Sequence, residues 1–142
     1  MTTLENHLKK TKKETLLNIV IDFDGVIHVN SKGFYDGTIY DKPIKGARKA
    51  LKTLYNNDFR LIIFTCKADP ERPIINGKSG IELIWEWLEK YDMDQYIQEI
   101  TYQKPRALFY VDDKGIRFEN WKETLEVIRT NKCLDDVIGW KK

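Results

Sequence analysis

Residues 19–27 decide the fold, and they run Ile19-Val20-Ile21-Asp22-Phe23-Asp24-Gly25-Val26-Ile27. A short apolar run that ends at a turn signal is typical of a strand buried on both faces. An unpaired carboxylate is costly to bury, so the two acids serve no structural need of such a strand. In open α/β sheets, ligands bind at the carboxyl ends of the strands. We therefore expect chemistry at this strand end, with a metal as the usual partner of paired acids.

Apolar runs and helical patterns alternate along the rest of the chain. The sequence predicts strands over 16–23, 59–65, 97–102 and 107–111, and helices over 44–57, 80–91 and 120–130. Residues 25–42 carry three Gly and are followed directly by Pro43, and residues 66–80 are rich in Gly and Pro. These residues predict a loop or small hairpin for the first segment and a loop for the second. Strands that alternate with helices are typical of a parallel sheet with right-handed crossovers, so the predicted class is α/β.

Two of the predicted helices carry an apolar stripe that we expect to face the core. The first stripe is formed by Ile81, Ile84, Trp85 and Leu88. The second is formed by Trp121, Leu125 and Ile128. Ser79 is placed to cap the first of these helices, and Trp87 lies off its stripe, which indicates a contact surface.

Length and composition indicate one globular domain. The 142 residues suffice for a single core over 1–142, with a basic tail or short helix over 1–15. The net charge of +2, from 24 basic and 22 acidic residues, is too even to indicate nucleic-acid binding. The two cysteines, Cys66 and Cys133, have neither metal-site spacing nor a disulfide framework, so we expect a reducing, cytoplasmic setting. We expect neither a membrane span nor a signal peptide.

Polar side chains also stand at the ends of the later predicted strands. Thr65 follows the second strand, Lys104 lies between the third and fourth, and Asp112-Asp113 follow the fourth. The carboxyl ends of parallel strands meet at one edge of a sheet, so these groups can converge with the first pair of acids. Carboxylates and phosphate oxygens bind Mg²⁺, and a carboxylate can itself attack phosphorus. A lysine and a hydroxyl stabilise the charge on the phosphoryl oxygens, so the set points to phosphoryl transfer through an aspartate.

In this order, the motif at residues 22–26, Thr65, Lys104 and the pair at 112–113 resemble the four motifs of the haloacid dehalogenase superfamily of phosphohydrolases. The resemblance covers about residues 17–130. It implies a three-layer, Rossmann-like parallel sheet with helices on both faces. It also implies a magnesium-dependent phosphatase that hydrolyses a phosphomonoester through an aspartyl-phosphate. In that chemistry Asp22 attacks phosphorus, and Asp24 protonates the leaving oxygen and then deprotonates the hydrolytic water.

The resemblance further implies which groups hold the metal. Asp113 looks like the direct ligand of Mg²⁺, and Asp112 like a partner of metal-bound water or of Lys104. Asp22 and the backbone carbonyl of Asp24 complete the implied set.

The phosphoryl oxygens would bind Thr65 and Lys104. Gly25, Cys66 and Lys67, which follow the first two motifs, are predicted to lie against the substrate. Two more cations on the loop after the second strand, Arg72 and Lys78, either bind an acidic group of the substrate or remain solvated. For His28, just past the first motif, we favour a local structural role.

The intervals between the motifs leave no room for a cap domain. Residues 25–42 suffice only for a hairpin-sized flap, and one loop, one helix and one strand fill the chain between Thr65 and Lys104. The chain is therefore expected to be a small, capless member with an open site. Its phosphorylated substrate and its oligomeric state are left open by the sequence.

Three other functions compete with a phosphatase. A phosphoacceptor domain of receiver type should have its acidic pair after the first strand and a lone acceptor Asp on a middle strand, and here the pair comes last. A DxD glycosyltransferase needs more chain for nucleotide and acceptor sites. A catalytically silent or regulatory phosphate-binding module on the same fold is the remaining alternative, although every motif position is filled.

Overall fold

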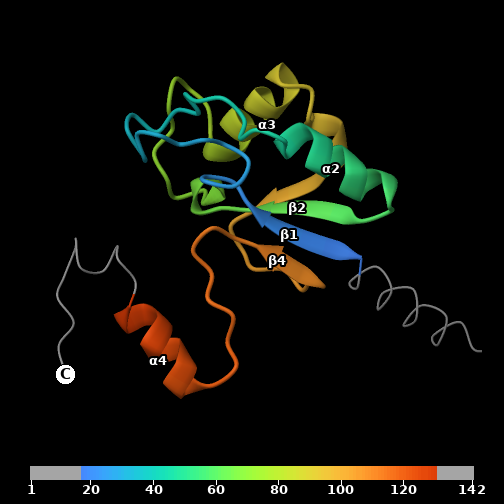
Figure 1. Cartoon of the computed structure of the whole chain (residues 1–142). Coiled ribbons are helices and arrows are strands. Elements are labelled where there is room, and N and C mark those ends of the chain that lie inside the picture. The colour runs from blue at the N-terminus through green and yellow to red at the C-terminus, as the bar shows by residue number, and fades with distance from the viewer. Residues whose placement is uncertain (1–16, 131–142) are drawn as a thin grey trace, which may run out of the picture.

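A computed structural model describes residues 17–130 of the chain (Figure 1). Four parallel strands form one sheet in the order β3-β2-β1-β4. The strands are β1 (Asn18–Asp22), β2 (Arg60–Phe64), β3 (Ile97–Thr101) and β4 (Phe109–Val111). The parallel sheet confirms the α/β class predicted from the alternation of apolar runs and helical patterns. The predicted tail over 1–15 and Cys133 lie outside the described residues.

The central position of β1 brings the first and last motifs together. Ile21 of β1 is paired with Ile63 of β2 on one side and with Val111 of β4 on the other. The residues that follow Ile21 and Val111 are therefore neighbours at the carboxyl edge of the sheet. This register places Asp22 beside the start of the loop that carries the second acidic pair.

Two helices cover one face of the sheet. Helices α2 (Ala47–Asn56) and α3 (Gly80–Lys90) lie on the same side of the strands, and the short 3₁₀ helices are η1 (Cys66–Ala68) and η2 (Asp94–Tyr96). Figure 1 shows α4 (Trp121–Arg129) apart from the sheet, at the end of an extended segment that follows β4. Within residues 17–130 no helix covers the other face of the sheet, so the three-layer arrangement with helices on both faces is not confirmed.

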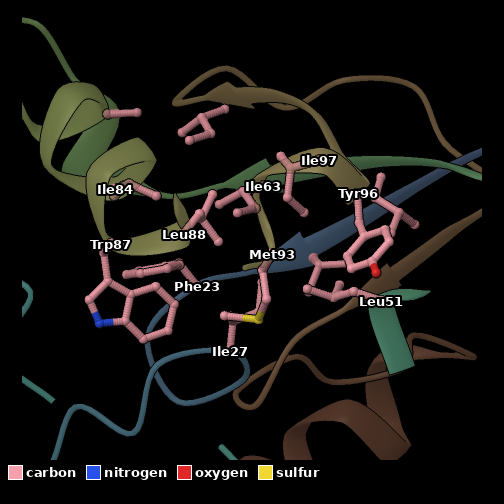
Figure 2. Packing of buried hydrophobic residues seen from close by; sticks show 14 of the residues in the cluster. Phe23, Ile27, Leu51, Ile63, Ile84, Trp87, Leu88, Met93, Tyr96 and Ile97 are labelled. Carbon is pink, nitrogen blue, oxygen red and sulfur yellow. The ribbon is translucent and has the colours of Figure 1, made fainter. Parts of the chain in front are cut away.

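The core lies between the sheet and the layer of α2 and α3. Figure 2 shows its packing, which includes Phe23, Ile27, Leu51, Ile63, Ile84, Trp87 and Leu88. Burying a side chain of this size stabilises the fold by about 1.5–3 kcal/mol. Val20 and Ile62 alternate with these residues along their strands and are buried on the opposite face. The central strands are thus buried on both faces, as the continuous apolar runs predicted.

Helix α3 turns a wider face to the core than expected: Ile84 and Leu88 are fully buried as predicted, and Trp87 is buried beside them. Trp87 is only 5% exposed, its indole N–H donates to the carbonyl of Asp41 (2.8 Å), and its ring meets the edge of Phe23. The prediction that Trp87 marks a contact surface is therefore wrong. Trp85 and Ile81 are half-buried at the margin of the core. Trp87 was misplaced because residues 84, 87, 88 and 91 recur at the same helical spacing as the predicted stripe, so spacing alone does not distinguish the two faces.

The cap of α3 was predicted correctly, but the inward face of α4 was not. The Ser79 hydroxyl accepts a hydrogen bond from the N–H of Glu82 (3.3 Å), which confirms Ser79 as the cap of α3. In α4, by contrast, Trp121 is 69% exposed and Leu125 48% exposed, so the prediction that this stripe faces inward is wrong for both. Ile128 is half-buried. The stripe has no layer to cover because α4 stands away from the sheet.

Candidate functional site

Three carboxylates gather at the carboxyl edge of the sheet. Asp22 ends β1, Asp112 and Asp113 follow β4 directly, and one oxygen from each lies within 4.8 Å of the others. Asp22 is half-buried, whereas the other two acids are exposed. Oxygen ligands of this kind suit Mg²⁺, which usually takes one or two carboxylates together with waters and substrate oxygens. The chemistry of this donor set therefore fits the cofactor implied by the sequence resemblance.

Gly25 allows the two acidic segments to approach each other. Its φ of +83° lies in the left-handed region, and a Cβ atom here would stand 2.3 Å from Oδ2 of Asp113. Its N–H donates to the carbonyl of His28 (2.8 Å), which closes the turn after β1. The sequence assigned Gly25 to the substrate, and the structure places it against a carboxylate of the acid cluster.

The acid cluster is electrostatically strained without a cation. Burial, followed by the charges of Asp112 and Asp113, raises the pKa of Asp22 from its ordinary 3.8 to about 6. The N–H of Phe23 donates to Oδ1 of Asp22 (2.8 Å) and opposes that rise. A divalent cation among the three acids would remove the repulsion, because it would be the largest charge at the site.

The carboxylate of Asp24 belongs to a different set of contacts. Oδ2 accepts an ion-paired hydrogen bond from Nζ of Lys67 (2.9 Å), and Oδ1 lies 2.8 Å from Nδ1 of His28. Burial raises the pKa of Asp24, but the hydrogen bonds from His28 and Lys67 outweigh burial, so the pKa lies below its ordinary value. The carboxylate is therefore outside the acid cluster of Asp22, and it is held ionised by the protein's own donors.

His28 is fully buried and bonded through both ring nitrogens. Nε2 accepts the backbone N–H of Asp41 (3.1 Å), so the neutral ring must carry its proton on Nδ1 and donate it to Asp24. The ring also stacks on Phe23 with the centroids 5.4 Å apart. The expected structural role of His28 thus includes a direct contact with a candidate catalytic acid, which sequence reasoning missed.

Lys67 reaches Asp24 because of the turn that follows β2. The N–H of Lys67 donates to Oγ of Thr65 (3.3 Å), so Thr65 caps the 3₁₀ turn that points the lysine inward. The Lys67 side chain is only 7% exposed. A Cβ on Gly80 would stand 1.8 Å from the carbonyl of Lys67, so only glycine lets α3 begin against this turn. The sequence assigned Lys67 to the substrate, and the structure places its ammonium on Asp24.

Thr65 and Lys104 stand in different environments. Thr65 is buried at the end of β2, and because its oxygen accepts from Lys67, its hydroxyl proton is left to donate elsewhere. Lys104 is exposed, with its ammonium 4.9 Å from the centre of the Tyr110 ring. Across residues 17–130 it forms no ion pair with a carboxylate. The lysine bonded to a site carboxylate is therefore Lys67.

Cys66 is exposed beside the same turn, and its thiol accepts a hydrogen bond from Nη2 of Arg72 (3.3 Å).

The structure brings Asp22, Asp112 and Asp113 together in one cluster and Asp24, Lys67 and His28 in another. Asp24 and His28 are four residues apart, a spacing that predicts contact between side chains in a helix but not in a turn. The contact between Asp24 and Lys67 joins residues far apart in the chain and has no signature in the sequence.

The fold and the site define an α/β protein with a parallel sheet and an acidic cluster at its carboxyl edge. Comparison of the chain with protein-family models, with curated proteins and with solved structures finds no match. In the part of the chain that the structure describes, no helix is both long enough and apolar enough to span a bilayer.

Proposed function

We propose that this protein is a magnesium-dependent phosphatase of the haloacid dehalogenase type, capless, which hydrolyses a phosphomonoester through an aspartyl-phosphate on Asp22. The observation that carries the proposal is the meeting of Asp22, Asp112 and Asp113 at the ends of adjacent parallel strands. A cluster of exposed acids alone is common in proteins. What adds weight is its position at the carboxyl edge of a parallel sheet, where open α/β sheets bind ligands.

In this proposal the three acids hold Mg²⁺, together with the backbone carbonyl of Asp24. Bound there, the ion supplies positive charge to the phosphoryl oxygens and neutralises the acid cluster. The hydroxyl proton of Thr65 is available to a phosphoryl oxygen at the neighbouring strand end.

The covalent steps follow from the two environments of the paired acids. An oxygen of Asp22 attacks phosphorus, the bond from phosphorus to the leaving oxygen breaks, and Asp24 passes that oxygen a proton that it takes from the ammonium of Lys67. Water then attacks the aspartyl-phosphate, Asp24 takes a proton from the water and returns it to Lys67, and the bond to Asp22 breaks to release phosphate. Lys67 and His28 hold the Asp24 carboxylate in place and ionised, which is the state that the second step requires.

The proposal is tested by hydrolysis of a generic aryl phosphate in the presence and absence of Mg²⁺. We expect turnover that requires the metal and is lost in Asp22→Asn. Asp58→Asn is a matched control, because Asp58 lies in a turn distant from the site and has a left-handed φ of 68°, which Asn tolerates well. Turnover that persists in chelator, or in Asp22→Asn, contradicts the mechanism.

A catalytically silent phosphate-binding module on the same fold is the second candidate. It is favoured by the position of Lys104, whose ammonium lies over Tyr110 and not on a site carboxylate. Purified protein that binds Mg²⁺ but turns over no ester in a broad panel of phosphomonoesters would favour this candidate over the enzyme.

A further inference from the structure

The proposed acid and base, Asp24, is bonded to a buried histidine that exchanges no proton in the proposed steps. Nδ1 of His28 lies 2.8 Å from Oδ1 of Asp24, and the His28 side chain is fully buried. The ring of Phe23 stacks on the imidazole, and the rings of Tyr40 and Trp87 meet it edge to face. This packing holds the imidazole in one orientation.

The second nitrogen of the imidazole is bonded to the end of the flap, residues 25–42. The backbone N–H of Asp41 donates to Nε2 of His28 at 3.1 Å, so the neutral ring carries its proton on Nδ1 and donates it to Asp24. In the other tautomer, the proton on Nε2 would face this N–H, and Nδ1 would have no proton to donate. The backbone at Asp41 therefore determines which group His28 presents to the carboxylate.

Asp41 is itself held from two sides. The indole N–H of Trp87 in α3 donates to the backbone carbonyl of Asp41 at 2.8 Å. The carboxylate of Asp41 accepts the N–H and the hydroxyl of Ser31, at 2.9 and 2.6 Å, which closes the part of the flap between these two residues. The position of Asp41 is therefore set by a core helix and by the flap itself.

These contacts form a continuous chain of hydrogen bonds from α3 to the proposed acid and base. Trp87 donates to the backbone of Asp41, and that backbone donates to His28. His28 in turn donates to Asp24. We call this series the positioning chain. In every link the acceptor lies nearer to the site than the donor along the series, so the positioning chain presents a proton donor to Asp24.

Lys67 and the positioning chain act on different atoms of Asp24. Nζ of Lys67 lies 3.0 Å from Oδ1 and 2.9 Å from Oδ2, so the ammonium does not distinguish between the two oxygens. Of these oxygens, His28 is bonded to Oδ1. Among residues 17–130, Oδ1 thus has two donors and Oδ2 has one. Each carboxylate oxygen accepts about two hydrogen bonds, so the position left for the leaving oxygen or the water is on Oδ2.

We propose that His28 is a positioning residue of the phosphatase. It occupies Oδ1 of Asp24 and so presents Oδ2 as the oxygen that gives a proton to the leaving group and takes one from water. Asp41 and Trp87 hold His28 in the tautomer and the orientation that this requires. The inference rests on the proposed function and deepens it. Because the direction of proton transfer matters in the transition state, loss of the positioning chain should lower kcat with little change in KM.

Two substitutions at His28 separate positioning from packing. His28→Leu keeps an apolar side chain among the aromatic rings but has no donor for Asp24. We expect kcat for a generic aryl phosphate with Mg²⁺ to fall about a hundredfold, with KM changed by less than about twofold. His28→Asn is smaller and polar, and its amide can donate from nearly the position of Nδ1. We expect it to recover about tenfold in kcat over His28→Leu, although it is the less stable of the two in urea unfolding.

A purely structural role of His28 predicts the opposite order, in which the more stable variant is the more active one. Wild-type kcat in His28→Leu, or a kcat in His28→Asn no higher than in His28→Leu, overturns the inference.

Substitution at the far end of the positioning chain decides the question even where a variant of His28 fails to fold. Trp87→Phe keeps an aromatic ring in the core and removes the indole N–H that Asp41 accepts. It should lower kcat about threefold to tenfold with KM unchanged, the effect of one lost hydrogen bond. Trp85→Phe is the matched control, because it makes the same change on the same helix but outside the positioning chain. It should retain the wild-type kcat, and an unchanged kcat in Trp87→Phe overturns the inference.

A spectroscopic measurement distinguishes failure of this inference from failure of the proposed function. The chain has two histidines, His7 and His28, so His7→Gln leaves one imidazole. ¹⁵N NMR of the full chain then reports which ring nitrogen carries the proton, and we expect it on Nδ1. A proton on Nε2 in a protein that hydrolyses the ester overturns the inference and leaves the phosphatase intact. A protein that hydrolyses no phosphomonoester while Nδ1 carries the proton contradicts the phosphatase instead, and the positioning role of His28 falls with it.

Discussion

Replacement of Asp22 by asparagine should stabilise the metal-free protein. Asparagine has nearly the same shape, and its amide oxygen can still accept the N–H of Phe23, which donates to Oδ1 at 2.8 Å in the structure. The substitution removes a negative charge that burial and the charges of Asp112 and Asp113 oppose. Under the proposed function, a site that is arranged for a cation weakens the fold when the cation is absent.

The magnitude follows from the raised pKa of Asp22. A rise from 3.8 to about 6 corresponds to about 3 kcal/mol, at about 1.4 kcal/mol per pKa unit. Asp22 is only half-buried, so solvent screens the interaction and we expect about 1–2 kcal/mol.

The sign of the pH dependence is fixed by the direction of the same shift. Because the folded pKa is raised, the contribution of Asp22 to stability is present in full below pH 3.8 and is lost as the pH rises through about 6. Asparagine does not titrate, so the advantage of Asp22→Asn over wild type should grow between those two pH values and stay level above them.

Urea unfolding in chelator, at a series of pH values from 4 to 8, measures the difference in the free energy of unfolding. Asp58→Asn, in a turn away from the acid cluster, controls for the general effect of removing one acid. Adding Mg²⁺ should reverse the order, because a ligand that binds only the folded state stabilises wild type more than a variant that lacks one of its carboxylates. An Asp22→Asn variant that is less stable than wild type in chelator above pH 6 would refute the electrostatic reasoning.

Three further substitutions test other parts of the structure. Gly25→Ala should weaken Mg²⁺ binding by about tenfold or more by displacing a neighbouring carboxylate, as measured by magnesium titration, whereas Gly33→Ala, with a similar φ but open space around it, should not. Trp87→Ala should lower the free energy of unfolding by roughly 3–5 kcal/mol, while Trp121→Ala should change it by less than about 0.5 kcal/mol; equal effects in urea unfolding would contradict the assignment of the core. Lys67→Met should lower the free energy of unfolding by roughly 1.5–3 kcal/mol at pH 7, because it leaves the half-buried carboxylate of Asp24 without its cation. Unchanged stability would show that the ion pair contributes nothing.

The sequence predicted those parts of the site that depend on the sheet alone. Parallel pairing of two apolar strands is enough to bring Asp22 next to Asp112 and Asp113, since all three follow directly on strand ends. Lys104 lies in the loop before β4, and the position of a loop side chain is not determined by the register of the strands. Its placement over Tyr110 could therefore not be derived from the order of the motifs.

The errors on the helices have a common cause. Helical spacing alone allowed two overlapping stripes on α3, and the interaction that selects the face with Trp87 is a hydrogen bond to Asp41, a residue distant in the chain. On α4 the spacing is equally regular, but amphipathic spacing shows only that a helix has an apolar face. It does not show that another layer covers that face, and Trp121 is largely exposed.

The two acids of the first motif illustrate how environment divides the work between identical side chains. Burial and the charges of Asp112 and Asp113 raise the pKa of Asp22, while the bonds from His28 and Lys67 outweigh burial and lower the pKa of Asp24. The protein thus supplies Asp24 with a cation of its own, Lys67, whereas under the proposed function Asp22 takes its cation from solution. A pair of titratable groups whose surroundings push their pKa values apart is a recurrent mark of acids with different catalytic roles. On this reasoning a metal at the site acts mainly on Asp22, and Asp24 keeps its partners whether or not the metal is bound.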